Sequence, residues 1–161
     1  MNPLRVVSPA QGQQYFIDWV PQSAALGFRF VETTPGRLVL DLPWREDLVG
    51  DPETGVLHGG VITTLVDAAC GGAILTHLET LRRIATLDLR IDYLRPARPG
   101  ATLRCTAECY RMTRQVAFAR AVVHDGNPDD GLATAAGTFM VFHEEGQPQR
   151  RTAPKEAGDE H

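Results

Sequence analysis

The sequence lacks the features that mark several classes of protein. Its three cysteines, Cys70, Cys105 and Cys109, form no CxxC pair, so we expect neither a disulfide framework nor a cysteine-rich zinc site. It has no GxSxG elbow, no phosphate-binding P-loop and no HxxxH spacing, so no metal site is predicted. Sixteen basic residues stand against twenty acidic ones, and the net charge of −4 disfavours nucleic acid as a partner.

A long uninterrupted apolar run is also missing. The longest apolar stretch, residues 56–75, contains His58, Asp67 and several glycines, so it is a poor candidate for a membrane span. The N-terminal residues have no apolar core of the kind that a secretory signal needs. Together with the few cysteines, these absences predict a reduced, cytoplasmic protein that does not bind a membrane.

The composition of the chain is that of one folded domain. Its 161 residues are 43% hydrophobic and 22% charged, which is enough apolar material for a core. We expect an N-terminal extension over residues 1–25, with a short helix in 12–25 that Pro21 ends or kinks. The main domain is expected over 26–144, followed by a polar, disordered tail over 145–161.

Hydrophobic periodicity predicts one helix and six strands. The helix covers residues 60–77 and is apolar nearly all round, so it should be buried. The strands are expected at 27–32, 37–42, 85–94, 101–110, 114–124 and 132–142. A largely antiparallel sheet wrapped around one buried helix is an α+β arrangement.

Alternation along the strands predicts which side chains face the core. In 85–94, Leu87, Leu89, Ile91 and Tyr93 should face one way, and Thr86 the other. In 101–110, Cys105 and Cys109 fall on the inward side, as small core residues.

Two glycines lie inside the predicted helix, where each costs about 1 kcal/mol relative to alanine. Gly71 and Gly72 are explained either by close packing against the sheet or by a ligand that passes close to the helix backbone.

Asp67 is the only charged side chain between His58 and His77. An unpaired carboxylate is costly to bury, so Asp67 either has a chemical role or is in contact with water. The alternatives are that it accepts hydrogen bonds from backbone N–H groups or lies at a polar subunit interface.

The triplet His58-Gly59-Gly60 stands where the helix begins. The first N–H groups of a helix have no internal partners and lie at its positive end. Two glycines allow another group to approach them closely, as in an oxyanion hole. The alternative is a glycine turn with a structural histidine.

The spacing of these residues predicts a shared site. Nine residues of helix from His58 to Asp67 put the two side chains roughly 180° apart and about 13 Å along the axis. One chain can hardly bring both to one reacting atom. A joint role therefore requires Asp67 from a symmetry-related subunit, and hence a homodimer.

Three arginines lie just before or within the fifth predicted strand, 114–124. Arg111, Arg114 and Arg120 are either solvated or available to the phosphates of a ligand.

Two segments together resemble the hotdog-fold thioesterases of the PaaI-like branch. Residues 55–60 match the family pattern G-x-x-H-G-G, and Asp67 follows seven positions after the second glycine. Residues 86–97 resemble the strand that follows in the family, with its terminal LRPA. The similarity covers roughly residues 26–142.

The resemblance implies a long antiparallel sheet around a central helix, in dimers that often pair into tetramers. Such proteins hydrolyse acyl-CoA thioesters and need no separate cofactor, because CoA is part of the substrate. The Gly59 N–H would polarise the thioester carbonyl, and His58 would help to position it. Asp67 of the partner subunit would act as general base or nucleophile.

Four further residues take expected roles from the same resemblance. Thr86 falls where relatives orient the attacking water, and Tyr93 lies near the cleft. Arg111 and Arg114 fall near the segment that contacts the CoA phosphates in relatives.

One position departs from the family pattern. Many relatives carry an asparagine six residues before the motif histidine, where this chain has Pro52. Glu53 or Thr54 would then have to substitute, or hydrolysis would be weaker. Hydrolysis of acyl-CoA is thus the leading hypothesis, beside an acyl-CoA-binding protein without activity and an enoyl-CoA hydratase or dehydratase.

Overall fold

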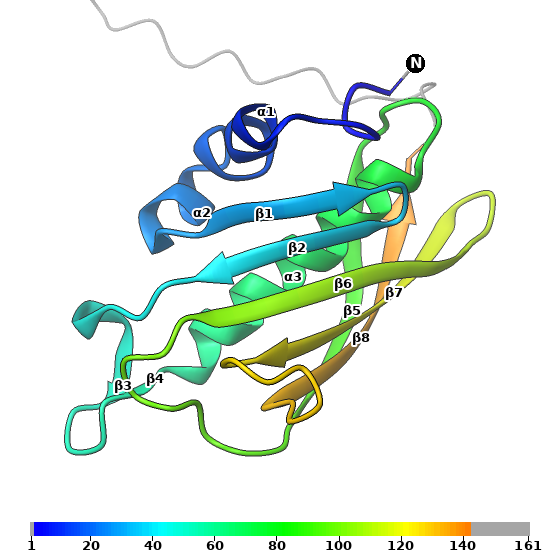
Figure 1. The fold of residues 1–161 in the computed structure, drawn as a ribbon. Helices are drawn as coiled ribbons and strands as arrows, with labels where there is room; N and C mark the ends of the chain where they lie inside the picture. Colours follow the sequence, from blue (N-terminus) through cyan, green and yellow to red (C-terminus); the bar gives the residue numbers. More distant parts are fainter. Residues whose placement is uncertain (1, 143–161) are drawn as a thin grey trace, which may run out of the picture.

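A computed structural model describes residues 2–142, in which a six-stranded antiparallel sheet wraps one long helix, α3, Gly59–His77 (Figure 1). The strand order is β1-β2-β6-β7-β8-β5. The strands are β1 Arg29–Thr34, β2 Arg37–Leu42, β5 Ile84–Tyr93, β6 Leu103–Met112, β7 Val116–His124 and β8 Ala133–Val141. The predicted α+β arrangement is confirmed. The tail expected over 145–161 lies outside the described residues.

The N-terminal extension is helical and packs on β1. It forms α1, Pro9–Gln13, then a π-helical turn, Gln14–Asp18, and α2, Pro21–Leu26. Helical structure begins earlier than predicted, because Ser8 caps α1 in a capping box. Pro21 does interrupt the helix and opens the next one at its first position. Because Phe16 and Ile17 are buried in the core, the extension is an integral layer of the fold.

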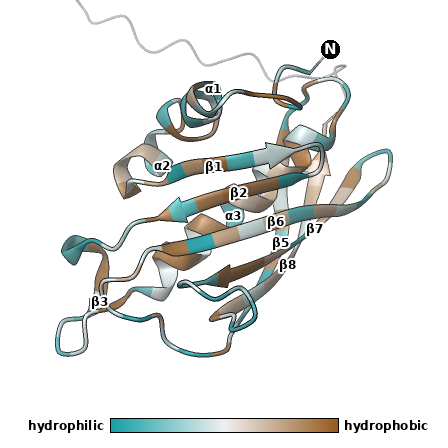
Figure 2. Cartoon of the chain, in the orientation of Figure 1, coloured by the Kyte–Doolittle hydropathy of each residue, from teal (hydrophilic) through white to brown (hydrophobic). Residues whose placement is uncertain are grey.

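Helix α3 lies in the curve of the sheet, as predicted. Leu65, Val66, Ala69, Ala73 and Ile74 are fully buried against the strands. Figure 2 shows hydrophobic and hydrophilic residues in turn along β6, as expected for a strand with one face on the core and one face outward. By length and composition, α3 is the one helix among residues 2–142 that could cross a membrane. Its packing against β2, β6 and β7 accounts for the same composition.

The cysteines are core residues, as predicted for Cys105 and Cys109. Both are buried, as is Cys70, and none forms a disulfide. Burial raises the pKa of each thiol, and that of Cys70 rises to about 12 with help from the nearby Asp67 charge. Thiols held in the neutral form in this way are poor nucleophiles.

The alternation predicted for the strand after the helix is wrong at Leu87. A β-bulge lies between Thr86 and Asp88, and Leu87 is 55% exposed. The extra residue shifts the alternation, because two residues of the bulged strand face one residue of its partner. As a result Thr86 faces α3, on the side opposite to the one predicted.

The long segment before α3 forms a small hairpin. A 3-10 turn, Glu46–Leu48, leads into β3, Val49–Asp51, which pairs with β4, Val56–Leu57. The His58 N–H donates to the Leu48 carbonyl at 2.9 Å. This hairpin therefore fixes where α3 begins.

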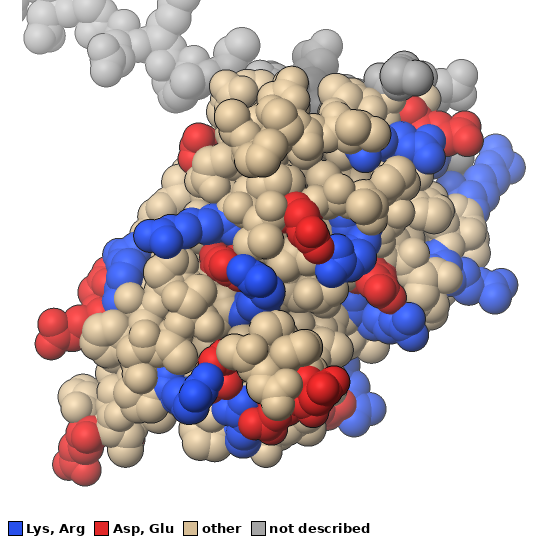
Figure 3. Space-filling model, viewed as in Figure 1, with Lys and Arg blue, Asp and Glu red and all other residues tan. Residues whose placement is uncertain are grey.

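The outer face of the sheet carries both signs of charge, interspersed over the side seen in Figure 3. Arg104 pairs with Asp41 at 2.8 Å, and Arg120 with Glu108 at 2.9 Å. The Arg120 guanidinium also lies over the Tyr110 ring, 5.9 Å from its centre. Of the basic group noted in the sequence, Arg120 is thus engaged on the outer face.

Candidate functional site

The amino end of α3 presents one free backbone donor. His58 is the N-cap, and its Nδ1 accepts a hydrogen bond from the Gly60 N–H at 2.9 Å. The Gly60 N–H is therefore engaged, whereas the Gly59 N–H has no partner within residues 2–142. Because Nδ1 accepts, a neutral His58 carries its proton on Nε2, which leaves a second donor on this exposed side chain.

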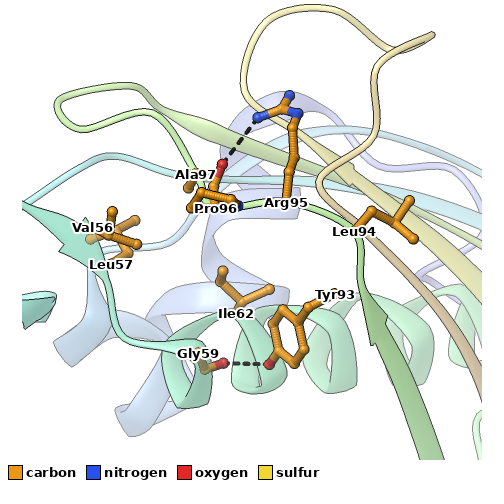
Figure 4. A pocket seen from close by; sticks show the side chains of 9 residues that line it. All are labelled: Val56, Leu57, Gly59, Ile62, Tyr93, Leu94, Arg95, Pro96 and Ala97. Carbon is orange, nitrogen blue, oxygen red and sulfur yellow. Dashed lines mark hydrogen bonds between the residues drawn. The ribbon is translucent and has the colours of Figure 1, made fainter. Parts of the chain in front are cut away.

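Tyr93 ties the end of β5 to the same turn. Its hydroxyl donates to the Gly59 carbonyl at 2.8 Å (Figure 4). The same hydroxyl lies 3.0 Å from the Thr63 hydroxyl. A Cβ at position 59 would lie 3.4 Å from the phenol oxygen, which is an ordinary van der Waals contact. The hydrogen bond from Tyr93 positions the turn that carries the free N–H.

A cavity of about 320 Å³ opens beside this turn. Figure 4 shows Tyr93 and Ile62 beside Gly59, with the segment Leu94–Ala97 above them. Most of the remaining lining is aliphatic, from Val56 and Leu57. The free N–H therefore lies next to a largely apolar pocket, where an oriented donor acts strongly on a developing charge.

Asp67 and Thr86 form a second polar pair on the side of α3 that the sheet leaves open. The Thr86 hydroxyl donates to Asp67 Oδ1 at 2.8 Å, and no donor within residues 2–142 contacts Oδ2. Asp67 accepts no backbone N–H from the described part of the chain, so it does not serve as a cap there. Its second oxygen is available to a water or a substrate.

Within one chain, the structure does not bring the Gly59 N–H and the Asp67 carboxylate together. Eight residues of helix separate Gly59 from Asp67, which is roughly 12 Å along the axis. No single reacting atom can touch both. The separation along the helix, from which the sequence predicts a shared site, is therefore present in the folded chain.

The two arginines expected near the CoA phosphates lie at the opposite end of α3. The Cys109 N–H donates to the Gly36 carbonyl, and a Cβ at Gly36 would lie 2.9 Å from His77, the last residue of α3. Arg111 and Arg114 follow on this strand and its turn, and both are exposed. The full length of α3, roughly 27 Å, separates them from the Gly59 end within one chain.

Pro52 lies exposed in the turn between β3 and β4. The Thr54 hydroxyl donates to Asp51 Oδ2 at 2.7 Å, and the Glu53 N–H to Asp51 Oδ1 at 3.0 Å. These bonds hold the pKa of Asp51 below its usual value. The Thr54 hydroxyl thus stabilises the turn locally and is not directed at the Gly59 end.

One structural pair was missed by sequence reasoning. Asp125, with a side chain only 2% exposed, accepts hydrogen bonds from Arg95 Nη1 at 3.0 Å, Arg95 Nη2 at 2.8 Å and the Arg98 N–H at 2.8 Å. The Arg95 guanidinium holds the pKa of Asp125 well below its usual value. Arg95 and Pro96 line the cavity, so Asp125 fixes one of its walls. Thirty residues separate the partners, and no local pattern links them.

An antiparallel sheet wrapped around one long helix is the arrangement of the hotdog fold. The sequence profile of the thioesterase superfamily matches residues 54–132. The Medium/long-chain acyl-CoA thioesterase YigI of Salmonella typhimurium is 34% identical over 142 residues, covering 80% of this chain and 90% of that protein. Its Escherichia coli counterpart is 33% identical over 141 residues, with the same coverage of 80% and 90%.

Solved structures agree with this assignment. A Pseudomonas aeruginosa protein is 36% identical, with a TM-score of 0.73 over 86% of this chain and 98% of that one. The PaaI protein of Escherichia coli has a TM-score of 0.72 at 19% identity, over 84% of this chain and 94% of that one, and shares the fold. The chain therefore belongs to the thioesterase superfamily and is a thioester hydrolase, with the fold of the PaaI protein.

Proposed function

We propose that the protein hydrolyses medium- or long-chain acyl-CoA to a free carboxylic acid and CoA. The observation that carries the proposal is the Asp67–Thr86 pair, a half-buried carboxylate with one oxygen held and the other open. The acyl-CoA thioesterase activity of the relatives supports acyl-CoA as the substrate class. The free Gly59 N–H supports stabilisation of an oxyanion.

In the proposed reaction Asp67 takes a proton from a water that Thr86 helps to orient. The water oxygen bonds to the thioester carbon, and the carbonyl electrons move onto oxygen. That oxyanion is stabilised by the Gly59 N–H and by His58 Nε2–H. When the carbonyl re-forms, the C–S bond breaks, and the thiolate of CoA accepts the proton that Asp67 received. Direct attack by the carboxylate, through an anhydride that water then opens, uses the same residues.

We further propose that a homodimer completes the site. Strand β5 is an edge strand whose far side has no pairing partner within residues 2–142, and Leu87 projects from it into solvent. An exposed edge and apolar side chain of this kind favour association. If β5 pairs with its own copy about a two-fold axis near the strand centre, Thr86 comes close to Tyr93 of the partner subunit. That arrangement would bring the Gly59 end of one chain to Asp67 of the other.

The first experiment is Asp67→Asn. An amide nearly matches the carboxylate in shape but cannot take a proton from water, so we expect release of CoA thiol to be lost while the fold is kept. Asp129→Asn, an exposed carboxylate in the loop between β7 and β8, is the matched control. A kcat close to wild type in Asp67→Asn would refute the role of the carboxylate. Binding of acyl-CoA without release of thiol by the wild-type protein would instead favour the binding protein.

The second experiment tests whether the site is shared. We expect His58→Ala and Asp67→Asn chains to lose activity when each is assayed alone, and a mixture of them to recover about a quarter of the wild-type activity per site. Random exchange makes half of the dimers heterodimers, and each heterodimer has one intact site. If mass measurement confirms exchange and no activity returns, each site lies within one chain.

A further inference from the structure

The peptide group between Gly59 and Gly60 is held by a side chain at each of its two polar ends. Its carbonyl, on Gly59, accepts a hydrogen bond from the Tyr93 hydroxyl at 2.8 Å (Figure 4). Its N–H, on Gly60, donates to His58 Nδ1 at 2.9 Å. The phenol at the end of β5 and the imidazole at the start of α3 are therefore joined through one peptide group. We call this arrangement the Tyr93–His58 link.

The direction of each hydrogen bond in the link is fixed. A carbonyl only accepts and an amide N–H only donates, so the Tyr93 hydroxyl is the donor at one end and His58 Nδ1 is the acceptor at the other. A neutral imidazole that accepts at Nδ1 carries its proton on Nε2, which is the donor that the proposed reaction uses. The opposite tautomer would point an Nδ1 proton at the Gly60 N–H and a lone pair at the oxyanion.

The two hydrogen bonds of the link strengthen each other. A hydrogen bond to a peptide carbonyl polarises the group and makes the N–H of the same peptide a stronger donor. Tyr93 therefore strengthens the bond from the Gly60 N–H to His58 without touching the imidazole. The Thr63 hydroxyl also donates to the Gly59 carbonyl, at 3.2 Å, but from within α3 itself. Tyr93 is thus the group that ties this peptide to the sheet.

Two close approaches hold His58 on its backbone side. A Cβ at Gly60 would lie 3.0 Å from His58 Nδ1, and a Cβ at Gly50 would lie 2.8 Å from the His58 Cα atom. The first glycine lets the imidazole lie against the turn. The second lets β3 lie against the His58 backbone, whose N–H donates to the Leu48 carbonyl. Because the backbone and Nδ1 are both held, the direction of the Nε2–H bond is set as well.

We propose that Tyr93 is a positioning residue for His58: through the Gly59–Gly60 peptide it holds the imidazole as the Nε2–H tautomer, directed at the oxyanion. This rests on the proposed thioester hydrolysis. The sequence placed Tyr93 near the ligand cleft, and its ring does line the cavity beside Gly59. The proposal gives its hydroxyl a role within the protein, because that hydroxyl is already engaged by the Gly59 carbonyl.

The kinetic test is Tyr93→Phe, which keeps the ring and removes the donor. We expect kcat to fall roughly 2- to 12-fold, the effect of losing one neutral hydrogen bond, with KM unchanged. Tyr110→Phe is the matched control. It removes a hydroxyl from a tyrosine of similar exposure on the outer face of the sheet, 54% against 50% for Tyr93, and should leave kcat unchanged.

A double-mutant cycle tests whether Tyr93 acts through His58. If it does, adding Tyr93→Phe to His58→Ala should lower the residual rate by less than about twofold, because the group that Tyr93 positions is already gone. If Tyr93 only stabilises the turn that carries the Gly59 N–H, the two losses should multiply. Multiplied losses would therefore overturn the proposal.

Two NMR measurements on the substrate-free protein test the link without catalysis. At about pH 8, above the usual titration range of imidazole, the nitrogen chemical shifts of the His58 ring report which nitrogen carries the proton. The wild type should show a protonated Nε2, and Tyr93→Phe should move both ring signals toward the average of the two tautomers. The Gly60 amide should exchange with solvent faster in Tyr93→Phe and at the wild-type rate in Tyr110→Phe.

The NMR and kinetic results separate this proposal from the proposed function. Unchanged ring signals and unchanged Gly60 exchange in Tyr93→Phe would overturn it, whatever the substrate. A rise in KM at constant kcat would overturn it too, because the Tyr93 hydroxyl would then contact the ligand itself. If the NMR results are as expected but the wild type releases no thiol from acyl-CoA, the link to His58 is supported and only the proposed hydrolysis is refuted.

Discussion

Replacing Asp125 by asparagine tests how one wall of the cavity beside Gly59 is held. In the wild-type chain the carboxylate is almost fully buried and receives both Nη groups of Arg95 together with the Arg98 N–H. An asparagine keeps one acceptor but turns an NH₂ group toward a donor, and it leaves Arg95 without its buried counter-charge. Breaking a buried ion pair from one side costs about 3 to 5 kcal/mol.

The lower end of that range applies, because Arg95 also contacts Asp130 and is partly solvated. A loss of about 3 kcal/mol corresponds to a fall in Tm of about 6 to 12 °C for a chain of this length. Asp130→Asn is the matched control: its side chain is 63% exposed, so we expect a loss below about 1 kcal/mol. Calorimetry at one protein concentration measures both variants.

The dependence on pH supplies a second test. The pKa of Asp125 is lower in the folded state than in the unfolded chain, so its contribution to stability is complete above the unfolded pKa of about 4. Below that pH the unfolded chain binds the proton first, and the wild type loses stability as the pH falls toward the folded pKa. The difference between wild type and Asp125→Asn should therefore shrink in acid. A Tm difference that is under 2 °C at neutral pH, or constant down to pH 3, would refute the reasoning.

Single substitutions test three further expectations. Thr86→Val removes a hydrogen bond to the Asp67 carboxylate, worth about 1.5 to 3 kcal/mol, so kcat should fall roughly 10- to 150-fold. Thr86→Ser should restore kcat, and an equal loss in both variants would contradict the role of the hydroxyl. Asn2→Ala leaves the Leu75 and Leu78 carbonyls, at the carboxyl end of α3, without their side-chain donor. It should lower the unfolding free energy by about 1 to 3 kcal/mol in urea titrations, whereas an unchanged midpoint would mean that water replaces the donor. Arg111→Ala and Arg114→Ala should raise KM for CoA esters but not for a short thioester without the nucleotide, and a loss with both substrates would indicate a folding role.

Much of the fold follows from local pattern. A continuous apolar run with a glycine pair and His58 at its start predicts α3, and the structure places its first residue within one position of the prediction. Regular alternation predicts β6 and the inward cysteines, because side chains on a strand point to opposite faces in turn. The same rule failed at Leu87, since a bulge adds a residue that depends on pairing with β8 and leaves no mark in the alternation of β5 itself.

In the candidate site too, some residues were identified from the sequence and some contacts are shown only by the structure. His58, Gly59 and Asp67 were found from the sequence, because a charged or glycine residue in an apolar run stands out and because helix geometry fixes how far apart they lie. The sequence could not show that Thr86 reaches Asp67, that Asn2 caps the far end of α3, or that Asp125 holds Arg95. These contacts join residues that are distant in the chain, and only the tertiary packing of strand against helix and loop against loop decides which of them meet.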